Sequence, residues 1–376
     1  MSAVDSQPVS TGEACRNKAL VTLRGRKMTL PPPEVYELIT KDACQILLTR
    51  YPQKINGRKG GKGPVLVVHG GSVSSKMFTL PTVKKNFVHF LYDAGYDIWL
   101  LDWRVSINLP VRLSTLGDAA KYDFPKAAEF IREQTHKDSI QAVVHCIGSL
   151  AFFISVQRGW VKNVRSIAAS AVALHPMVGT VERAKTAIHL AAQLRRLGMT
   201  EVSPLADPMY PLYSLAVRAM VDSVHQECTS TVCHKLTFMY GHTFLHDALN
   251  LETHERLAEQ FGPCNLQTLM HVEQCINLGH LADYDYGIAG NLERYGSEVP
   301  PSCVDNADNF KNVKIRLISG ECNQLFLPPS TEATLQWLKS KNPKGDYDRV
   351  VIKGHGHWDV FAGANSDADC YPEFLL

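Results

Sequence analysis

The chain has 376 residues, of which 45% are hydrophobic and 20% charged, and its formal net charge is +2. This balance predicts an ordinary soluble globular protein with a substantial core, built as one large α/β domain or two smaller ones. A net charge so close to zero gives no basic field for nucleic acid or an anionic membrane surface, so no nucleic-acid partner is expected.

Ten cysteines are scattered along the sequence, which favours reduced thiols over a disulfide framework. The nearest pair, Cys228 and Cys233, lacks the two-residue spacing and the second matching pair of a typical zinc site. The N-terminus has no apolar signal-peptide core, and no run of about eighteen apolar residues occurs. We therefore expect a cytoplasmic protein without stable membrane insertion, and the sequence does not indicate its oligomeric state.

The first 63 residues contain one predicted strand between two polar segments. Residues 1–33 are polar and end in three prolines, which predicts a flexible tail. Residues 43–51 have the composition of a strand. The basic, glycine-rich residues 57–63 predict a solvated turn, because they lack the spacing and the following helix of a phosphate-binding loop.

A continuous apolar run follows at 64–68, which is typical of a strand buried on both faces in a parallel sheet. It ends in a His-Gly-Gly-Ser turn at 69–72. Two glycines after a buried strand allow a close backbone approach, and hydrolases use this position for a second oxyanion N–H. A plain tight turn explains the same residues equally well.

Strands and helices then alternate. Helical spacing at 83–94 is followed by a strand at 96–102, and helical spacing at 123–134 is followed by a strand at 140–144. A further strand is expected at 167–174. This βαβ rhythm predicts an α/β fold with a mostly parallel central sheet and helices on both faces.

The stretch Val144-His145-Cys146-Ile147-Gly148 joins a β-branched strand to an apolar helix, with a thiol at the turn. Such a turn lifts a nucleophile out of the sheet and places the next N–H at a helix N-terminus, ready to hold an oxyanion. The usual pattern is GxSxG. Cysteine can replace serine, but valine stands where glycine normally keeps the turn uncrowded. Taken alone, the stretch is more often explained by a buried structural cysteine, because free cysteine is among the most buried residue types.

The alternation of strands and helices stops at 177–300, where helical segments rich in Leu, Ala and Met dominate. This change predicts a helical cap inserted into a core formed by 34–176 and 301–376. Many histidines lie in this cap. His242 and His246 share a helical spacing, but no HExxH set occurs, so we expect no metal site.

Strand character returns at 313–320 and again at 348–352. Polar groups suited to catalysis come directly after each of these strands, so a nucleophile, a polar loop and a histidine follow one another in chain order. These later candidates are Glu321, Asn323, His355 and His357.

Together, the motifs VLVVHGG, DAGYDIWLLDWR and GHGHWD resemble the α/β-hydrolase fold from residue 36 to the end. They look most like the acid lipase and polyhydroxyalkanoate synthase branch, and closer still to the hydrolase-like domain joined to some cholesterol-oxidase-type flavoproteins. The GxGxxG after a strand that a flavin domain would need is missing, so no cofactor is expected.

The resemblance implies roles for the matching residues. Cys146 matches the nucleophile and His357 the catalytic base, with His355 as a nearby alternative. His145, beside the nucleophile, either tunes the thiol or lines the pocket.

The same resemblance assigns the oxyanion donors and the histidine's partner. The donors would be the N–H of Ile147 and that of Gly71 or Ser72. The acid position falls on Asn323, which can orient an imidazole without supplying charge, as in the Cys-His-Asn version of the triad. Glu321 is the alternative orienter.

Three functions fit this pattern. The first is acyl transfer by a thioesterase, esterase or acyltransferase, acting on an ester or acyl thioester with a bulky apolar group of polyketide or lipid type. The second is carbon–carbon bond formation or cleavage, cyclisation or dimerisation of a specialised metabolite on the same fold. The third is a non-catalytic protein that binds a small molecule in the same pocket.

Overall fold

The computed structural model describes residues 30–53, 61–205 and 228–376. Its centre is an eight-stranded sheet in the order β1-β2-β4-β3-β5-β6-β9-β10. The strands are β1 Glu34–Ile39, β2 Gln45–Tyr51, β3 Gly63–Val68, β4 Tyr96–Asp102, β5 Ile140–His145, β6 Val164–Ser170, β9 Lys314–Gly320 and β10 Tyr347–Ile352. The β1–β2 and β2–β4 pairs are antiparallel, and every other neighbouring pair is parallel. The predicted mostly parallel sheet is therefore confirmed.

One strand of the sheet was not predicted, and another has bounds that differ from the predicted ones. The antiparallel edge strand β1 was not expected, because 34–39 mixes exposed and buried side chains without a clean alternation. Strand β6 starts at Val164, three residues before the predicted start, and ends at Ser170, four residues before the predicted end. It ends there because Ala171 adopts a positive φ of 79° that breaks the extended backbone. Residues 1–29 of the predicted tail and residues 57–60 of the predicted basic turn lie outside the described residues.

Helices cover both faces of the sheet because successive strand side chains point to opposite sides. Leu66 and Val68 of β3 belong to the core cluster that contains α3 and α4, whereas Val65 and Val67 belong to the cluster that contains α1 and α14. The core helices and turns are η1 Ser75–Phe78, α1 Phe87–Asp93, α2 Leu116–Asp118, η2 Ala119–Asp123, α3 Phe124–Thr135, α4 Ile147–Gln157, η4 Asp308–Phe310, α13 Pro329–Lys341, α14 Asp359–Ala362, α15 Ser366–Asp369 and η5 Tyr371–Phe374.

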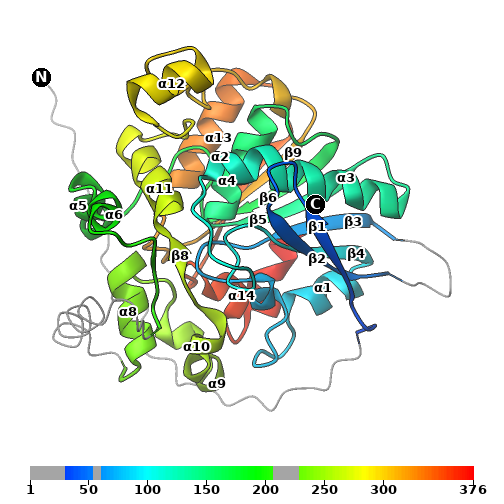
Figure 1. Ribbon diagram of the computed structural model, residues 1–376. Helices are drawn as coiled ribbons and strands as arrows, with labels where there is room; N and C mark the ends of the chain where they lie inside the picture. The colour runs from blue at the N-terminus through cyan, green and yellow to red at the C-terminus, as the bar shows by residue number, and fades with distance from the viewer. Residues whose placement is uncertain (1–29, 54–60, 206–227) are drawn as a thin grey trace, which may run out of the picture.

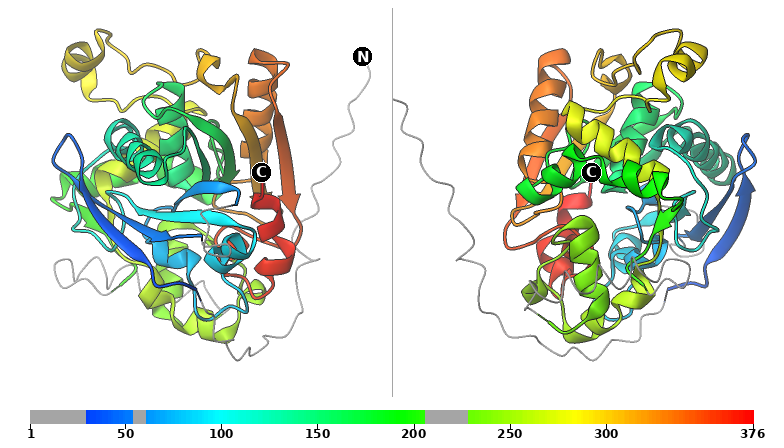
Figure 2. Two further views of the ribbon diagram at one scale, coloured as in Figure 1. Left: turned by 90° about the vertical axis from the view of Figure 1, so that its right-hand side faces the viewer. Right: turned by 60° about the vertical axis from the view of Figure 1, so that its left-hand side comes forward.

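The part of the chain from residue 177 to residue 300 is mainly helical where the structure describes it. It contains α5 Thr180–Ala187, α6 Leu190–Arg196, β7 Glu201–Val202, α8 Thr231–Tyr240, η3 His246–Ala248, α9 Leu251–Glu255, α10 Leu257–Gln260, β8 Cys264–Asn265, α11 Leu266–Leu278 and α12 Gly287–Tyr295. Helix α11 packs against α5 and α6. In Figure 1 these helices lie to the left of the large sheet, and Figure 2 shows α12 at the opposite end of the molecule from α8–α10. We call this region the cap.

Candidate active site

Cys146 stands at the turn between β5 and α4, where the sequence predicts a nucleophile elbow. Its backbone has φ 58° and ψ −134°, a conformation that is strained for any residue except glycine. Three backbone hydrogen bonds hold it: the Cys146 N–H donates to the Ser170 carbonyl oxygen at 3.1 Å, and the Cys146 carbonyl oxygen accepts from the N–H groups of Ser149 at 2.9 Å and Leu150 at 3.4 Å. The surrounding structure thus fixes the thiol at a sharp strand-to-helix turn.

Glycine is required at position 148 but not at position 144. A Cβ on Gly148 would lie 2.3 Å from the His69 carbonyl oxygen, so only glycine lets α4 start this close to the loop after β3. Val144, in contrast, is fully buried and pairs with Val68 and Ala169 on the neighbouring strands. Its side chain fills the core of the sheet, which explains why the turn tolerates valine in place of the usual first glycine.

Burial and two neighbouring backbone N–H groups have opposite effects on the pKa of the Cys146 thiol. Burial raises the pKa of this thiol to about 11, while hydrogen bonds from the N–H groups of Gly71 and Ile147 act in the opposite direction. The side chain and the N–H of Ser72 instead act on the thiol of Cys264, where they oppose the rise in pKa that burial causes. Of the two predicted alternatives, it is therefore the N–H of Gly71 that acts on Cys146.

The His-Gly-Gly loop that carries Gly71 is held by buried polar contacts. The fully buried His69 donates from Nδ1 to the Gly70 carbonyl oxygen at 2.7 Å, and its Nε2 lies 3.6 Å from Asp102 Oδ1. Trp103 Nε1 donates to the His69 carbonyl oxygen at 3.1 Å. A Cβ on Gly70 would lie only 2.8 Å from the Cβ of Cys146, so the loop approaches the elbow as closely as its backbone allows.

His357 follows β10 and lines the same cavity as Cys146. It is 3% exposed, and burial lowers its pKa to about 3, so the imidazole is neutral at physiological pH. Its ring centroid lies 4.7 Å from that of His145 and 6.0 Å from that of Phe326. Its Nδ1 is buried and has no hydrogen-bond partner among the residues that the structure describes.

Asn323 is 2% exposed and lies in the loop after β9. Its Oδ1 accepts hydrogen bonds from the N–H groups of Leu325 and Phe326, both at 3.1 Å, which fixes the orientation of the amide. Its Nδ2 is buried without a partner in the described part of the chain. The side chain therefore offers a donor, not an acceptor, to its remaining surroundings, and the described residues include no hydrogen bond between Asn323 and His357.

The loops that carry these two residues are nevertheless in contact. The Cys322 N–H donates to the His355 carbonyl oxygen at 2.9 Å. A Cβ on Gly320 would lie 2.1 Å from the Gly356 carbonyl oxygen. The ends of β9 and β10 thus bring the polar loop and the histidine loop together, as expected for neighbouring parallel strands.

The three alternative residues lie differently. Glu321 is exposed and accepts a hydrogen bond from the Gly354 N–H at 3.2 Å. His355 donates from Nδ1 to the Lys353 carbonyl oxygen at 3.0 Å and is not part of the cavity lining. His145 does line the cavity, but its Nδ1 lies 3.1 Å from Ser170 Oγ. This geometry favours His357 over His355 as the base.

The cavity above Cys146 has a volume of about 170 Å³ and is mainly apolar. Side chains from the cap form most of its wall, including Leu190, Leu194, Phe238, Leu269, Val272 and Ile276. Because the described core residues contribute mainly the elbow, the Gly70-Gly71 loop and the histidines, the cap defines the shape of the space in which an apolar group would lie.

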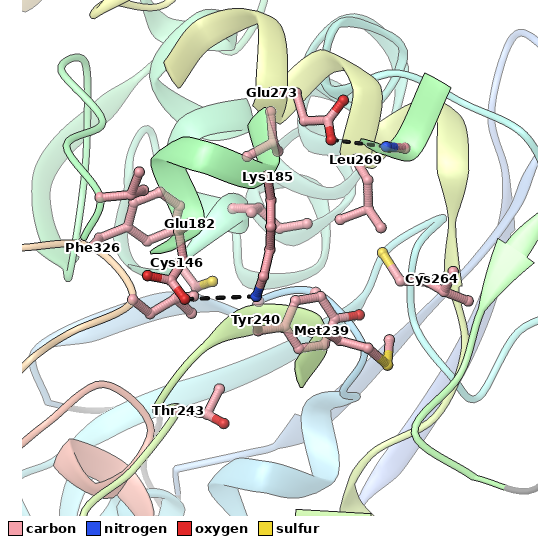
Figure 3. A pocket seen from close by; sticks show the side chains of 18 of the residues that line it. Cys146, Glu182, Lys185, Met239, Tyr240, Thr243, Cys264, Leu269, Glu273 and Phe326 are labelled. Atoms are coloured by element: carbon pink, nitrogen blue, oxygen red, sulfur yellow. Dashed lines mark hydrogen bonds and ion pairs between the residues drawn. The ribbon is translucent and has the colours of Figure 1, made fainter. Parts of the chain in front are cut away.

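Charged cap residues also reach this cavity, although no sequence motif indicated them. Figure 3 shows Lys185 extending from α5, where its Nζ donates to the Phe238 carbonyl oxygen at 2.7 Å and lies 3.7 Å from Glu182 Oε1. Glu273 of α11 accepts from the Ala191 N–H at 2.9 Å, and burial raises its pKa to about 7. Isolated charges on amphipathic helices carry no motif, so only the packing of the helices assigns them to the cavity.

A second group of polar residues meets elsewhere in the cap. Ligand atoms of Cys228, Cys233, His246 and His254 all lie within 4.8 Å of one another. The sequence indicated no metal site, because these residues come from separate segments with no familiar spacing.

Comparison with known proteins places this geometry in context. No protein-family model matches the chain. Lipase lipl-1 of Caenorhabditis elegans is 24% identical over 93% of this chain and 91% of its own length. A carboxyl esterase from Bacillus coagulans has a TM-score of 0.54 at 14% identity, covering 86% of this chain and 91% of its own. The α/β hydrolase GrgF from Penicillium sp. sh18 has a TM-score of 0.52 at 16% identity, covering 92% and 99%.

The chain therefore has the α/β-hydrolase fold. The closer likeness to the polyhydroxyalkanoate synthase branch and to cholesterol-oxidase-linked domains stays a prediction, as does the cytoplasmic location. Within the described residues, no helix is long and apolar enough to cross a membrane.

Proposed function

We propose that the chain is an acyl-transfer enzyme that cleaves an ester or thioester of a bulky apolar acyl group, with Cys146 as nucleophile. The observation that carries the proposal is the strained turn at Cys146, with the Gly70-Gly71 loop packed against it: a Cβ on Gly70 would lie 2.8 Å from the Cβ of Cys146. The N–H groups of Gly71 and Ile147 both act on the buried thiol. A structural cysteine has no need of this strain or of two converging donors. An oxyanion that forms beside the sulfur does need them.

The proposed reaction starts from a neutral thiol and a neutral imidazole. His357 accepts the thiol proton while the sulfur attacks the acyl carbonyl carbon, and the Gly71 and Ile147 N–H groups stabilise the resulting oxyanion. The leaving alcohol or thiol takes the proton from His357, which gives an acyl-cysteine. Because the pKa of the thiol is about 11 and that of His357 about 3, proton transfer must accompany the attack.

The cavity supports a substrate with a large apolar part. Its apolar wall favours burial of an acyl chain or a polyketide, at roughly 25 cal/mol per Å² of apolar surface removed from water. Lys185, with its ammonium group at the cavity, is suited to a carbonyl or carboxylate oxygen at the far end of such a substrate. These two features favour an amphiphilic acyl donor over a small, fully polar one.

A second candidate function is transfer of the acyl group to a bound carbon or oxygen nucleophile instead of water. The observation that favours it concerns His357. This imidazole has a low pKa and, within the described residues, no carboxylate bonded to Nδ1, so it is a weak base for activating water in the deacylation step. A nucleophile that belongs to a bound substrate and is held in the apolar cavity would need less help from His357 to attack the acyl group.

The test uses p-nitrophenyl esters and acyl-N-acetylcysteamine thioesters of increasing chain length with the wild type, Cys146→Ala and Cys146→Ser. We expect Cys146→Ala to lose about 10³-fold or more in kcat/KM. Intact mass should show an acyl adduct in the wild type and none in this variant. Cys370→Ser, at another buried free cysteine, is the matched control and should retain activity.

Product mass separates the two candidate reactions. Hydrolysis adds water to the acyl fragment, whereas transfer gives a product that contains both substrate parts. Undiminished turnover by Cys146→Ala would remove the thiol from the mechanism. An absence of turnover and of adduct across the panel, with ligands still binding, would favour a non-catalytic binding protein.

A further inference from the structure

Four potential metal ligands converge at the end of the cap formed by α8 and α9. Cys228 precedes α8, and Cys233 lies in the first turn of that helix. His246 begins η3, and His254 lies on α9. Their ligand atoms are all within 4.8 Å of one another, although the residues span three separate elements.

We propose that Cys228, Cys233, His246 and His254 form a structural zinc site. Two thiolates and two imidazoles are a donor set that Zn²⁺ accepts in tetrahedral geometry. Bond lengths of about 2.3 Å to sulfur and about 2.0 to 2.1 Å to nitrogen place tetrahedral ligand atoms about 3.4 to 3.8 Å apart. Cys233 Sγ and His246 Nε2 are already 3.3 Å apart, and the longest separation must shorten by only about 1 Å.

The surroundings of the histidines fit this role. The Nε2 of His254 is buried and has no hydrogen-bond partner among the described residues, a state that is costly for a polar atom and is relieved by a metal bond. The rings of His246 and His254 have centroids 5.0 Å apart, and Phe244 packs on both at 5.4 and 6.1 Å. This aromatic packing restricts the orientation of both imidazoles.

The thiols also lie in a suitable place. Cys233 is 1% exposed and occupies the first turn of α8, where the partial positive charge of the helix N-terminus favours a thiolate. Two thiolates and two neutral imidazoles balance the charge of Zn²⁺, so the bound site carries no net charge into a half-buried region. Soft thiolate ligands disfavour Mg²⁺ and Ca²⁺, which prefer oxygen.

All four ligands come from the protein, which makes this a closed structural site and not a catalytic one. Its effect would be to join α8 to α9. Helix α8 carries Phe238 and Tyr240 of the cavity wall, and α9 is tied to the core by a 2.6 Å hydrogen bond between Thr253 and Thr82. The metal would therefore anchor one wall of the cavity to the core, whatever reaction occurs inside it.

The experiment measures zinc in the full-length chain, purified without a histidine tag or chelator and then desalted into metal-free buffer. Elemental analysis should find about one zinc per chain in the wild type, and less than about a tenth of that in Cys233→Ser and in His254→Ala. Cys370→Ser, at a buried free cysteine outside the cluster, should keep the wild-type content.

A second measurement covers the case in which a ligand variant fails to fold. Wild-type protein reloaded with Co²⁺ should show the intense visible bands of tetrahedral cobalt and a thiolate charge-transfer band in the near ultraviolet. Addition of a chelator should lower the melting temperature of the wild type but not that of a folded ligand variant. Zinc content near zero in the wild type would overturn the proposal. So would an octahedral cobalt spectrum, or a disulfide between Cys228 and Cys233 in freshly purified protein.

Discussion

Alkylation of Cys146 should be slow at neutral pH and should accelerate steeply as the pH rises. Its thiol has a pKa of about 11, so at pH 7.5 about one molecule in 3,000 carries the thiolate, against about one in ten for an ordinary cysteine. The higher intrinsic nucleophilicity of a more basic thiolate recovers about tenfold of this difference. The net expectation is labelling about 20- to 30-fold slower than that of a free thiol.

The assay is iodoacetamide labelling at several pH values, with Cys146 followed by peptide mass mapping and N-acetylcysteine as the reference thiol. The rate should rise about tenfold per pH unit between pH 7 and pH 10, because only the thiolate reacts. This slope separates the pKa effect from restricted access, which would lower every rate by the same factor. His357→Ala should leave the slope unchanged, since a neutral imidazole does not hold the thiol as an ion pair.

Rapid labelling that is independent of pH between 6 and 9 would refute this reasoning. It would mean that Cys146 and His357 form a thiolate–imidazolium pair, and His357→Ala should then slow labelling sharply. The neutral pair assumed in the proposed mechanism would have to be abandoned in that case.

Three further variants test the surroundings of the thiol. Asn323→Asp replaces a buried donor by an acceptor, so it should raise the pKa of His357 and move the acid limb of the kcat/KM profile to higher pH. Glu273→Gln should flatten the pH dependence of the free energy of unfolding. Burial raises the pKa of the Glu273 carboxyl from 4.5 to about 7, so the wild type loses stability as the pH rises across that interval. The loss should be about 1 to 2 kcal/mol after allowance for solvent screening. Gly148→Ala should lower the free energy of unfolding by about 1 to 3 kcal/mol in denaturant titrations, because its Cβ meets the His69 carbonyl oxygen.

Each of these expectations has a clear contrary result. An acid limb that stays in place in folded Asn323→Asp protein would show that position 323 does not influence the histidine. A melting temperature whose pH dependence is the same with and without Glu273 would assign that dependence to other groups. Wild-type stability in Gly148→Ala would show that the elbow can shift without loss.

The positions of most core strands along the chain were predictable because each of these strands leaves a local signature, whereas their order in the sheet was not predicted. The continuous apolar run at 64–68, the Gly-Gly turn after it and the strand-to-helix switch at Cys146 are all set by neighbours in sequence. These signals also placed Cys146, Gly71 and His357 around one cavity. The edge strand β1 was missed because an edge exposes part of its surface and so loses the buried pattern.

The chemistry of the site was less predictable than its location. The residues around Asn323 do not indicate that its side-chain oxygen accepts hydrogen bonds from the N–H groups of Leu325 and Phe326, because these bonds depend on how the loop turns. The pKa of Cys146 depends on how completely the cap excludes water. The Cys-His cluster likewise depends on how three short cap segments fold together, which no spacing rule describes.

The hydroxyl groups of Ser72 and Tyr240 share a hydrogen bond that joins the oxyanion loop to the last turn of α8. Ser72 has a positive φ of 57°, and its carbonyl oxygen accepts from the Gly262 N–H at 2.9 Å, so cap contacts on two sides hold a backbone that would otherwise relax. Gly71 is its immediate neighbour. The conformation of the loop that carries the Gly71 N–H therefore depends on its contacts with α8 and with the chain at Gly262, so a change in how α8 packs would be transmitted to this loop.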